Sequence, residues 1–413
     1  MVAKKKIVQG CVRVCRLWML GLILTIFCSA GLYAQKDDEI VKALVNAGFE
    51  NVSRVVSDTE EIITFENSVW KADGEGIREA INVIEKYPFI AGKTRRVIVL
   101  QLGLPQISLV LPPSAPVAVP GTTNSGWLST YGLGDVWKAV KNTPRINRSR
   151  WKVDLVFYPQ FAFRNQKYRR IYDVLLNLSP ALEIAPMRGM KITGQVIIPV
   201  FNQYGAKYEQ IRPGFFTLEQ HFRVLNNFVD LTAGIFNQDR WGLDLRLSRP
   251  VMTEGWLSNF AVEGRIGLTG SSYFYHWNWH YGAAKLVTWN VGGSYYNPQY
   301  NVQCDLRVEK FLAGDIGVRA DMTRHFKRTS IGFYVMKNDR DNVDGGFHFS
   351  ILIPPMKLKR GRHIRVAPAK YFNLEYKAAG LFYNGRSYKT LPGQNRAEDN
   401  FNPNYIKSQL PNN

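Results

Sequence analysis

The alternation of apolar and polar residues between positions 302 and 324 limits the fold more than any other feature. Apolar residues hold every second place in two runs around a turn at 312–314, which predicts two antiparallel strands. The apolar places are Val302, Cys304, Leu306, Val308, Ile316, Val318, Ala320 and Met322. The places between them are Gln303, Asp305, Arg307, Glu309, Gly317, Arg319, Asp321 and Thr323. The pattern leaves open whether the polar face meets water outside the protein or inside it.

The same alternation recurs through most of the chain from residue 151 to residue 355, and its extent answers that question. Twelve candidate strands cover 151–165, 170–187, 190–202, 211–224, 228–237, 240–251, 256–270, 281–296, 301–312, 314–325, 329–338 and 345–355. Strands of soluble sheets usually have about 5–6 residues, whereas about 9–11 tilted residues cross a bilayer. The sequence therefore predicts a mainly β protein with an antiparallel transmembrane β-barrel of about twelve strands. Its polar face lines the interior, and Trp241, Trp256 and Trp289 suit an aromatic girdle.

The first 34 residues predict a secretory signal peptide. Five basic residues flank the start of an apolar run at 17–30, which is short for a transmembrane helix. Ala30 or Ala34 suits cleavage, whereas a lipoprotein anchor at Cys28 is disfavoured because residues 25–27 lack small side chains. Export combined with the predicted barrel places the protein in the cell outer membrane.

The mature chain is strongly basic. The 413 residues carry a formal charge of +20, and removal of the five basic signal residues, with no acidic residue among them, leaves +15. This excess favours anionic partners such as acidic glycans and membrane lipid. Nucleic acid is not expected as a partner of an exported chain without a binding motif. Only Cys304 remains after cleavage, and we expect it to behave as a small apolar residue.

The segment before the barrel predicts a small periplasmic α/β domain. It contains a helix that ends at Gly48, a hairpin, a helix with Asp73 as candidate N-cap that stops before Pro88, and two strands around Gly103. A Pro/Gly-rich linker follows, with a short helix near "GDVWKAVKN". The predicted segments are 1–34, signal peptide; 36–111, α/β domain; 112–150, linker and ambiguous segment; 151–356, barrel; and 357–413, a C-terminal extension expected in the periplasm.

Candidate catalytic and metal-binding residues are few. His276 and His280 have a spacing that suits a metal on a helix, but "YFYHWNWHY" is not a helical pattern, so no metal site is predicted. His348 and Ser350 share a strand face, as the Ser and His of a lipid-acting barrel hydrolase would, but no positioned acid accompanies them. We therefore expect no enzyme activity and no cofactor.

The aromatic run "SSYFYHWNWHYG" at 271–282 and several arginines on polar strand faces are candidate glycan contacts. Aromatic rings could stack on sugar rings while the arginines meet acidic groups. Two other interpretations stay open: an aromatic belt at the membrane surface and a ladder of ion pairs that fills a narrow barrel. The candidate glycan-contacting residues are Tyr275, Trp277, Trp279, Arg265, Arg307 and Arg319.

Several short motifs resemble one known family. "AGFENV" (47–52), "TFENSVW" (64–70) and "LGLPQISLVL" (102–111) resemble the α/β module of YjbH-type exopolysaccharide-biosynthesis outer-membrane proteins. "RHFKRTSIGFYVMKN" and "DGGFHFSILIPP" resemble the closing strands of that family's barrel, and "HIRVAPAKYFNLEYKAAG" continues the likeness. The resemblance covers about half of the chain. Familiar members are longer and carry additional barrel and α/β modules, so this chain resembles a short, single-barrel member.

The resemblance implies an outer-membrane component that assists export or assembly of a secreted exopolysaccharide or capsule. Its implied partners are outer-membrane lipid, an anionic polysaccharide and periplasmic polysaccharide-export proteins. Two alternatives remain open at this stage. One is a general diffusion channel or a structural adaptor of another secretion machine, and the other is a lipid-acting barrel hydrolase.

Overall fold

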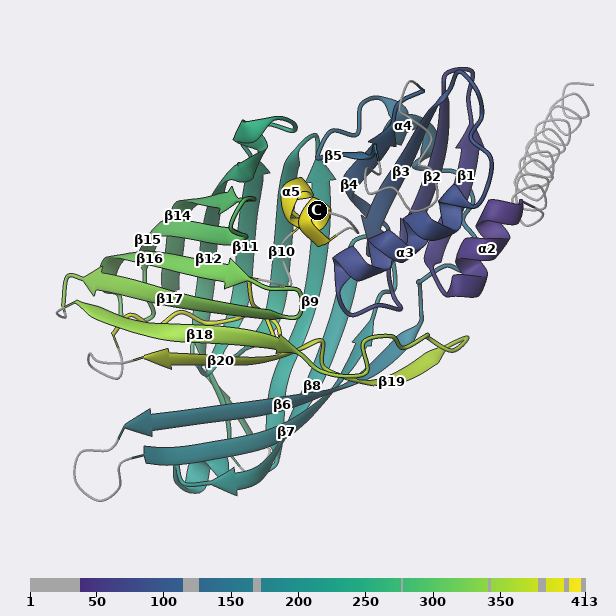
Figure 1. The fold of residues 1–413 in the computed structure, drawn as a ribbon. Coiled ribbons are helices and arrows are strands. Elements are labelled where there is room, and N and C mark those ends of the chain that lie inside the picture. The colour runs from purple at the N-terminus through teal and green to yellow at the C-terminus, as the bar shows by residue number, and fades with distance from the viewer. Residues whose placement is uncertain are drawn as a thin grey trace, which may run out of the picture.

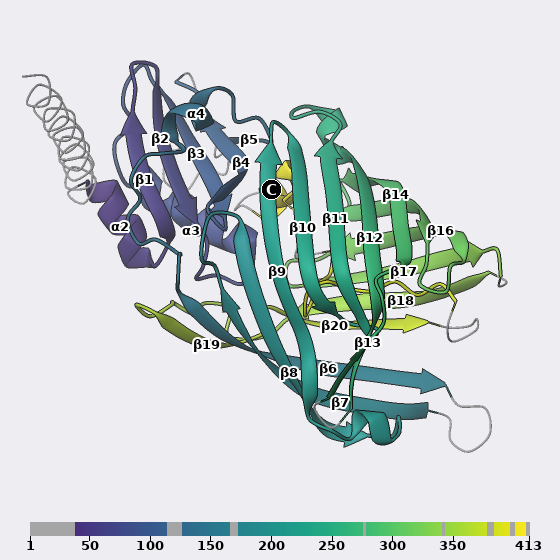
Figure 2. The same ribbon diagram turned by 180° about the vertical axis from the view of Figure 1, so that it is seen from behind.

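The computed structural model describes residues 38–113, 126–165, 172–275, 278–340, 343–377, 384–396 and 401–409. The protein is mainly β, with a small five-stranded sheet and a large sheet of fifteen strands that curls around an interior (Figures 1 and 2). No helix among the described residues is long and apolar enough to cross a membrane. The expected signal peptide, 1–34, lies outside the described residues.

The small sheet and its helices form the α/β domain. Its strands, in spatial order, are β1 (Glu50–Val56), β2 (Glu60–Glu66), β3 (Thr94–Gln101), β4 (Leu104–Leu111) and β5 (Leu128–Thr130). β2 and β3 run parallel, since α3 (Asp73–Glu85) crosses between them. α2 (Glu39–Ala47) ends as expected at Gly48, whose φ of 104° suits a residue without Cβ. Ala72, and not Asp73, occupies the N-cap of α3.

The helices bury their apolar stripes on the two faces of this sheet. Leu44 of α2 and Ile77 of α3 belong to a core with Phe65 on one face. α4 (Val136–Val140) covers the other face. β5 and α4 come from the segment expected to be a linker, so the domain extends past residue 111 because β5 pairs with β4.

Each of the twelve strands predicted from the alternation corresponds to one strand of the large sheet, and successive strands pair as antiparallel neighbours. These strands are β6 (Val153–Asn165), β7 (Tyr172–Ile184), β8 (Met190–Asn202), β9 (Arg212–Val224), β10 (Asn227–Phe236), β11 (Arg240–Pro250), β12 (Phe260–Tyr275), β14 (Leu286–Asn297), β15 (Val302–Lys310), β16 (Ile316–His325), β17 (Thr329–Asn338) and β18 (Asp344–Leu352). β13 (Asn278–Tyr281) forms a short hairpin with the end of β12.

The large sheet exposes its apolar face and buries its polar face. On β15 the Leu306 side chain is 59% exposed, whereas its neighbour Asp305 is 2% exposed. A sheet packed on a soluble core shows the opposite sidedness. The polar face is therefore the inner one. The outer face carries large exposed apolar side chains on strand after strand, among them Leu182, Ile198, Phe216, Leu231, Leu243, Ile266, Val291, Leu306, Val318, Phe333, Ile351 and Val366.

The sheet continues past the expected boundary at residue 356. β19 (Ile364–Pro368) pairs parallel with β6, and β20 (Tyr371–Lys377) pairs antiparallel with β18. Only Ala369 and Lys370 separate these two strands, so one segment joins the two sides of the curled sheet. The sequence does not mark this continuation, because both strands are short, Pro354 and Pro355 precede them and Pro368 ends β19.

The C-terminal segment also departs from the expected separate extension. Residues 384–396 run through the interior of the curled sheet, and α5 (Pro403–Gln409) packs beside the α/β domain (Figure 1). Ile406 of α5 is fully buried in the core that α2 and α3 build. We call residues 384–396 the inner segment.

Candidate functional site

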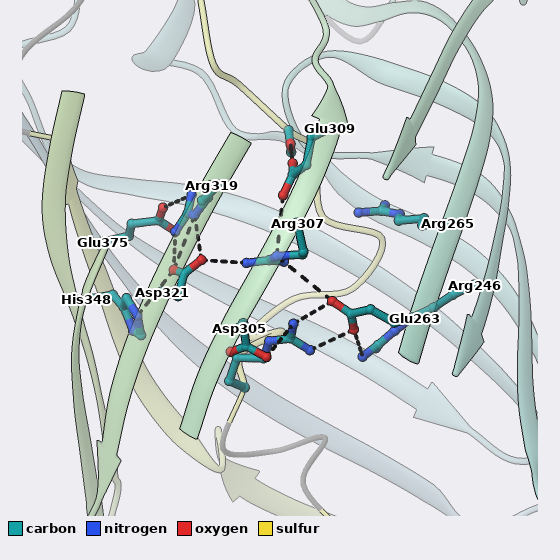
Figure 3. A network of polar contacts seen from close by, with 12 residues as sticks. Arg246, Glu263, Arg265, Asp305, Arg307, Glu309, Arg319, Asp321, His348 and Glu375 are labelled. Carbon is teal, nitrogen blue, oxygen red and sulfur yellow. Dashed lines mark hydrogen bonds and ion pairs between the residues drawn. The ribbon is translucent and has the colours of Figure 1, made fainter. Parts of the chain in front are cut away.

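The interior of the curled sheet holds a network of ion pairs around Arg307 (Figure 3). Arg307 Nη2 lies 2.8 Å from Asp321 Oδ2, and its Nε lies 3.5 Å from Glu309 and 3.9 Å from Glu263. These carboxylates come from β12, β15 and β16, whose alternation directs alternate side chains inward. One guanidinium thus faces three carboxylates from three strands.

Arg319 extends this network toward β20. Its guanidinium lies 2.9 Å from Asp321 and 3.0 Å from Glu375, and it also stacks at 3.9 Å over the Tyr334 ring. Asp321 therefore bridges Arg307 and Arg319. Because β20 was not expected in the sheet, Glu375 could not be recognised as a partner from the alternation alone.

Arg265 occupies a neighbouring position on the inner face of β12. Its Nε donates to Asp244 at 2.8 Å, and its Nη1 donates to the Tyr388 carbonyl at 3.2 Å. All three arginines proposed as glycan contacts therefore point into one interior, and each has a carboxylate partner. An anionic ligand would have to compete with these carboxylates, so the observed arrangement matches the ion-pair ladder among the open interpretations.

The inner segment makes its own contacts with this network. The Tyr388 hydroxyl donates to Asp244 at 2.5 Å, and its ring stacks on Phe236 at 5.3 Å. Arg396 lies 2.7 Å from Glu263 and 3.1 Å from Asp305. These contacts could not be recognised from the sequence, because their partners are more than 90 positions away along the chain.

A cavity of about 1710 Å³ remains beside the inner segment. Its walls include inward side chains of the large sheet, the inner segment itself and residues 66–71 of the α/β domain. The cavity exceeds the roughly 300–1,000 Å³ of ordinary small-molecule pockets. Residues of the inner segment form part of its lining.

The hairpin that β13 forms with the end of β12, which we call the aromatic hairpin, lies at the end of the sheet opposite the α/β domain (Figure 2). Trp279 Nε1 donates to Ser272 Oγ at 2.8 Å, and its ring lies 4.7 Å from Tyr281 and 6.2 Å from Trp241. Tyr275 and Trp279 both have exposed rings. Trp277 and His276 lie outside the described residues.

The structure separates the aromatic half of the predicted glycan site from its arginine half. Tyr275 follows Arg265 by ten residues on the same strand, which corresponds to about 33 Å at the usual rise of a strand. The hairpin and the arginines could therefore contact successive parts of one long ligand, but not a single sugar unit.

The pair considered for lipid hydrolysis does not form a catalytic hydrogen bond among the described residues. His348 Nε2 faces Thr323 Oγ1 at 3.5 Å and Asp321 at 3.8 Å, and Ser350 belongs to the same inner face. A buried His325–Ser330 contact of 2.9 Å also exists, with Gln303 on the other ring nitrogen. Within the described residues, no group of three or more His, Cys, Asp or Glu side chains could hold a metal ion.

Lys71 of the α/β domain contacts the segment that connects β19 to β20. Its ammonium donates to the carbonyls of Ile353, Pro368 and Ala369 at 2.7, 3.0 and 2.8 Å. Two of these carbonyls lie at the junction of β19 and β20. Burial, together with the nearby charges of Arg365 and Lys370, lowers the pKa of Lys71 to about 8.

Glu66 supports the β3–β4 turn that faces the large sheet. Its carboxylate accepts from the backbone N–H groups of Leu102 at 3.0 Å and Gly103 at 2.9 Å. Leu102 has a φ of 50°, which is unfavourable for a side chain of its kind. Burial and the Glu50 carboxylate raise the pKa of Glu66.

Comparisons with known proteins give little beyond this geometry. No family model matches the chain, and no curated protein matches it. A solved structure with some similarity is OmpTdeltaL8, a loop L8 deletion mutant of OmpT, an outer membrane protein of Vibrio cholerae. The identity is 8% and the TM-score 0.26, over 48% of this chain and 86% of that chain. A similarity at this level supports no conclusion about function.

Proposed function

We propose that the protein is an outer-membrane β-barrel that assists export or assembly of a secreted exopolysaccharide or capsule. The observation that carries the membrane part is the reversed sidedness of the large sheet. Apolar side chains are exposed on strand after strand, while charged side chains are buried inside. Apolar surfaces of this extent mark contacts with a membrane or a partner, and alternation of apolar-out with polar-in is the pattern of transmembrane barrels.

The polysaccharide part rests on the resemblance to YjbH-type proteins and on the chemistry of the interior. A cavity with carboxylates, arginines and amides along its walls offers hydrogen bonds to sugar hydroxyls. Exposed aromatic rings at the opposite end from the α/β domain offer stacking surfaces. In this proposal the α/β domain lies in the periplasm and receives the partner proteins of export.

Deletion of the gene and its complementation test this function. We expect loss of cell-associated and secreted polysaccharide in the deletion strain, restored by the wild-type gene. Complementation with a Tyr275→Ala, Trp279→Ala double variant should restore less polysaccharide while the protein still shows heat-modifiable gel mobility. Unchanged polysaccharide in the deletion strain would remove the export role.

A structural adaptor is the second candidate, and the position of the inner segment inside the sheet favours it. The inner segment lies in the interior and is held there by Tyr388 and Arg396, so it takes up space that passing material would need. An adaptor needs the outer apolar face and the α/β domain but not the cavity. Variants that narrow the cavity, such as Ser248→Trp, should reduce polysaccharide only if material passes through the interior.

A further inference from the structure

One part of the rim of the large sheet, at the end that carries the α/β domain, is entirely basic. Four chain segments form it: 145–152, 185–189, 324–328 and 353–370. They contain four, one, three and six Lys or Arg residues respectively, which makes fourteen, and they contain no Asp or Glu. The turns at the opposite end mix both signs, as Lys207, Asp239, Asp339 and Arg340 illustrate.

Backbone hydrogen bonds make these four segments one continuous surface. The Trp151 N–H donates to the Ala185 carbonyl at 3.0 Å, and the Val153 N–H donates to the His363 carbonyl at 2.8 Å. The Leu352 N–H donates to the Arg328 carbonyl at 2.9 Å, which joins the β16–β17 turn to the segment after β18. We call this surface the basic rim.

Carboxylates of neighbouring elements neutralise only a minority of the fourteen charges. Five of the fourteen residues form ion pairs with Glu50, Glu75, Asp154 or Asp73, namely Lys152, Arg328, Arg360, Arg365 and Lys370. Seven others are exposed and form no ion pair with any described residue: Arg148, Arg150, Arg324, Lys327, Lys357, Lys359 and Arg362. The surface therefore carries a large uncompensated positive charge.

A buried arginine adds to this charge. Arg145 is 8% exposed, and its Nε and Nη2 have no hydrogen-bond partner among the described residues. Its guanidinium and that of Arg188 both stack on the Trp137 ring, at 5.4 and 5.8 Å. Two like charges share one ring here without a bonded counterion, so an external anion would relieve their repulsion.

Large apolar side chains stand next to these cations on the outer face. Trp151 is 69% exposed, Ile364 64% and Val366 60%. We propose that the basic rim binds the phosphate groups of anionic phospholipids in the adjoining membrane leaflet. A phospholipid presents a phosphate directly beside acyl chains, which matches cations beside an apolar outer face. A water-soluble anionic glycan would leave Trp151, Ile364 and Val366 in water.

This inference rests on the membrane insertion in the proposed function, and not on its polysaccharide part. The test uses the full chain reconstituted in phosphatidylcholine vesicles with spin-labelled phosphatidylglycerol or spin-labelled phosphatidylcholine as probe. The immobilised fraction of each probe, measured by electron paramagnetic resonance, gives the relative association constant. We expect a preference for phosphatidylglycerol that weakens with salt.

The triple variant Arg148→Gln, Arg150→Gln, Arg362→Gln should lose most of this preference. The relative association constant for phosphatidylglycerol should fall by up to about fivefold for each charge removed. The matched control is the triple variant Lys207→Gln, Lys285→Gln, Arg340→Gln. It removes three positive charges at the opposite end of the large sheet and should keep the preference for phosphatidylglycerol. Equal association of the two probes with the wild type, or an equal loss in the control, would overturn the proposal. A third result would also overturn it: the protein does not prefer phosphatidylglycerol but binds polygalacturonate in a salt-dependent way that requires the three arginines.

The outcomes also separate this inference from the proposed function. Failure of the chain to insert into vesicles would contradict both the lipid binding and the proposed membrane function. A deletion strain with normal polysaccharide removes the export role alone, and the lipid preference then stands on the vesicle data.

Discussion

Leu306 and Asp305 are neighbours in the chain, yet their side chains lie in opposite environments. Leu306 lies on the outer face of β15, so in the proposed membrane-inserted state Leu306→Arg places a charge against the hydrocarbon of the bilayer. The expected cost is about 2–4 kcal/mol of folding free energy if the position is near mid-membrane depth. Leu306→Met keeps the apolar surface and should be nearly neutral. The fraction of protein with heat-modifiable mobility and its urea midpoint measure the difference, and equal values for both variants would contradict the membrane assignment.

Glu66 shows how one buried carboxylate can support a strained turn. Glu66→Ala removes the acceptor for the N–H groups of Leu102 and Gly103, so we expect a loss of about 1–3 kcal/mol for each N–H left without a partner. Urea unfolding of the full chain in detergent measures this loss. Ser57→Ala, at an exposed turn of the same domain, is the control and should change stability little.

The same carboxylate predicts a dependence on pH. Burial and Glu50 raise the pKa of Glu66 in the folded protein above its ordinary value of 4.5. Its contribution is therefore fully present below about pH 4.5 and is lost as the pH rises through the higher folded pKa. Glu66→Gln cannot ionise, so the stability of this variant relative to the wild type should increase as the pH rises. A difference that stays constant with pH would contradict the raised pKa.

At the scale of elements, the sequence predicted what depends on a regular period and missed what depends on tertiary contacts. Twelve long strands with strict alternation were recognisable, because a half-exposed strand must repeat every two residues. β19 and β20 were not, since both are short, Pro368 ends the period of β19, and only pairing with β6 and β18 makes them strands. β5, with three residues, carries too little pattern to be seen.

The contact between the α/β domain and the junction of β19 and β20 yields a prediction for Lys71. Lys71→Met leaves the carbonyls of Ile353, Pro368 and Ala369 without this donor, so the junction of β19 and β20 should open more often. Amide hydrogen exchange of the peptide covering 364–377 should become faster in this variant. Lys93→Met, on the opposite end of the same domain, should leave that peptide unchanged. Protection that is equal in all three proteins would show that Lys71 does not hold the junction.

At the scale of the whole molecule, the inward position of Arg265, Arg307 and Arg319 could be predicted, but their surroundings could not. Alternation placed each arginine on the polar face together with acidic neighbours. The inner segment, whose Tyr388 and Arg396 contact that face, has no period and no charge pattern that marks it. The distance between Tyr275 and Arg265 also depends on how far β12 extends past its neighbours, which a single sequence does not reveal.

The position of the inner segment leads to a prediction about conductance. Residues 384–396 contact β10, β11, β12 and β15 from inside the curled sheet. They therefore occupy part of the cross-section of the interior through which ions would pass. Removal of residues 384–413 should therefore raise the single-channel conductance of the protein in a planar bilayer severalfold. Removal of residues 403–413 alone deletes α5 but leaves Tyr388 and Arg396 in place, and this control should raise conductance much less.

A point variant tests whether the ion pairs of Arg396 hold the inner segment. Arg396→Gln breaks the contacts with Glu263 and Asp305 and should produce brief openings of the larger conductance while the chain keeps its full length. Lys407→Gln, in α5, changes the same charge outside the interior and should leave the recordings unchanged. Heat-modifiable mobility confirms that each variant is folded before it is recorded. If the variant lacking 384–413 folds and conducts no better than the wild type, the inner segment does not limit passage through the interior.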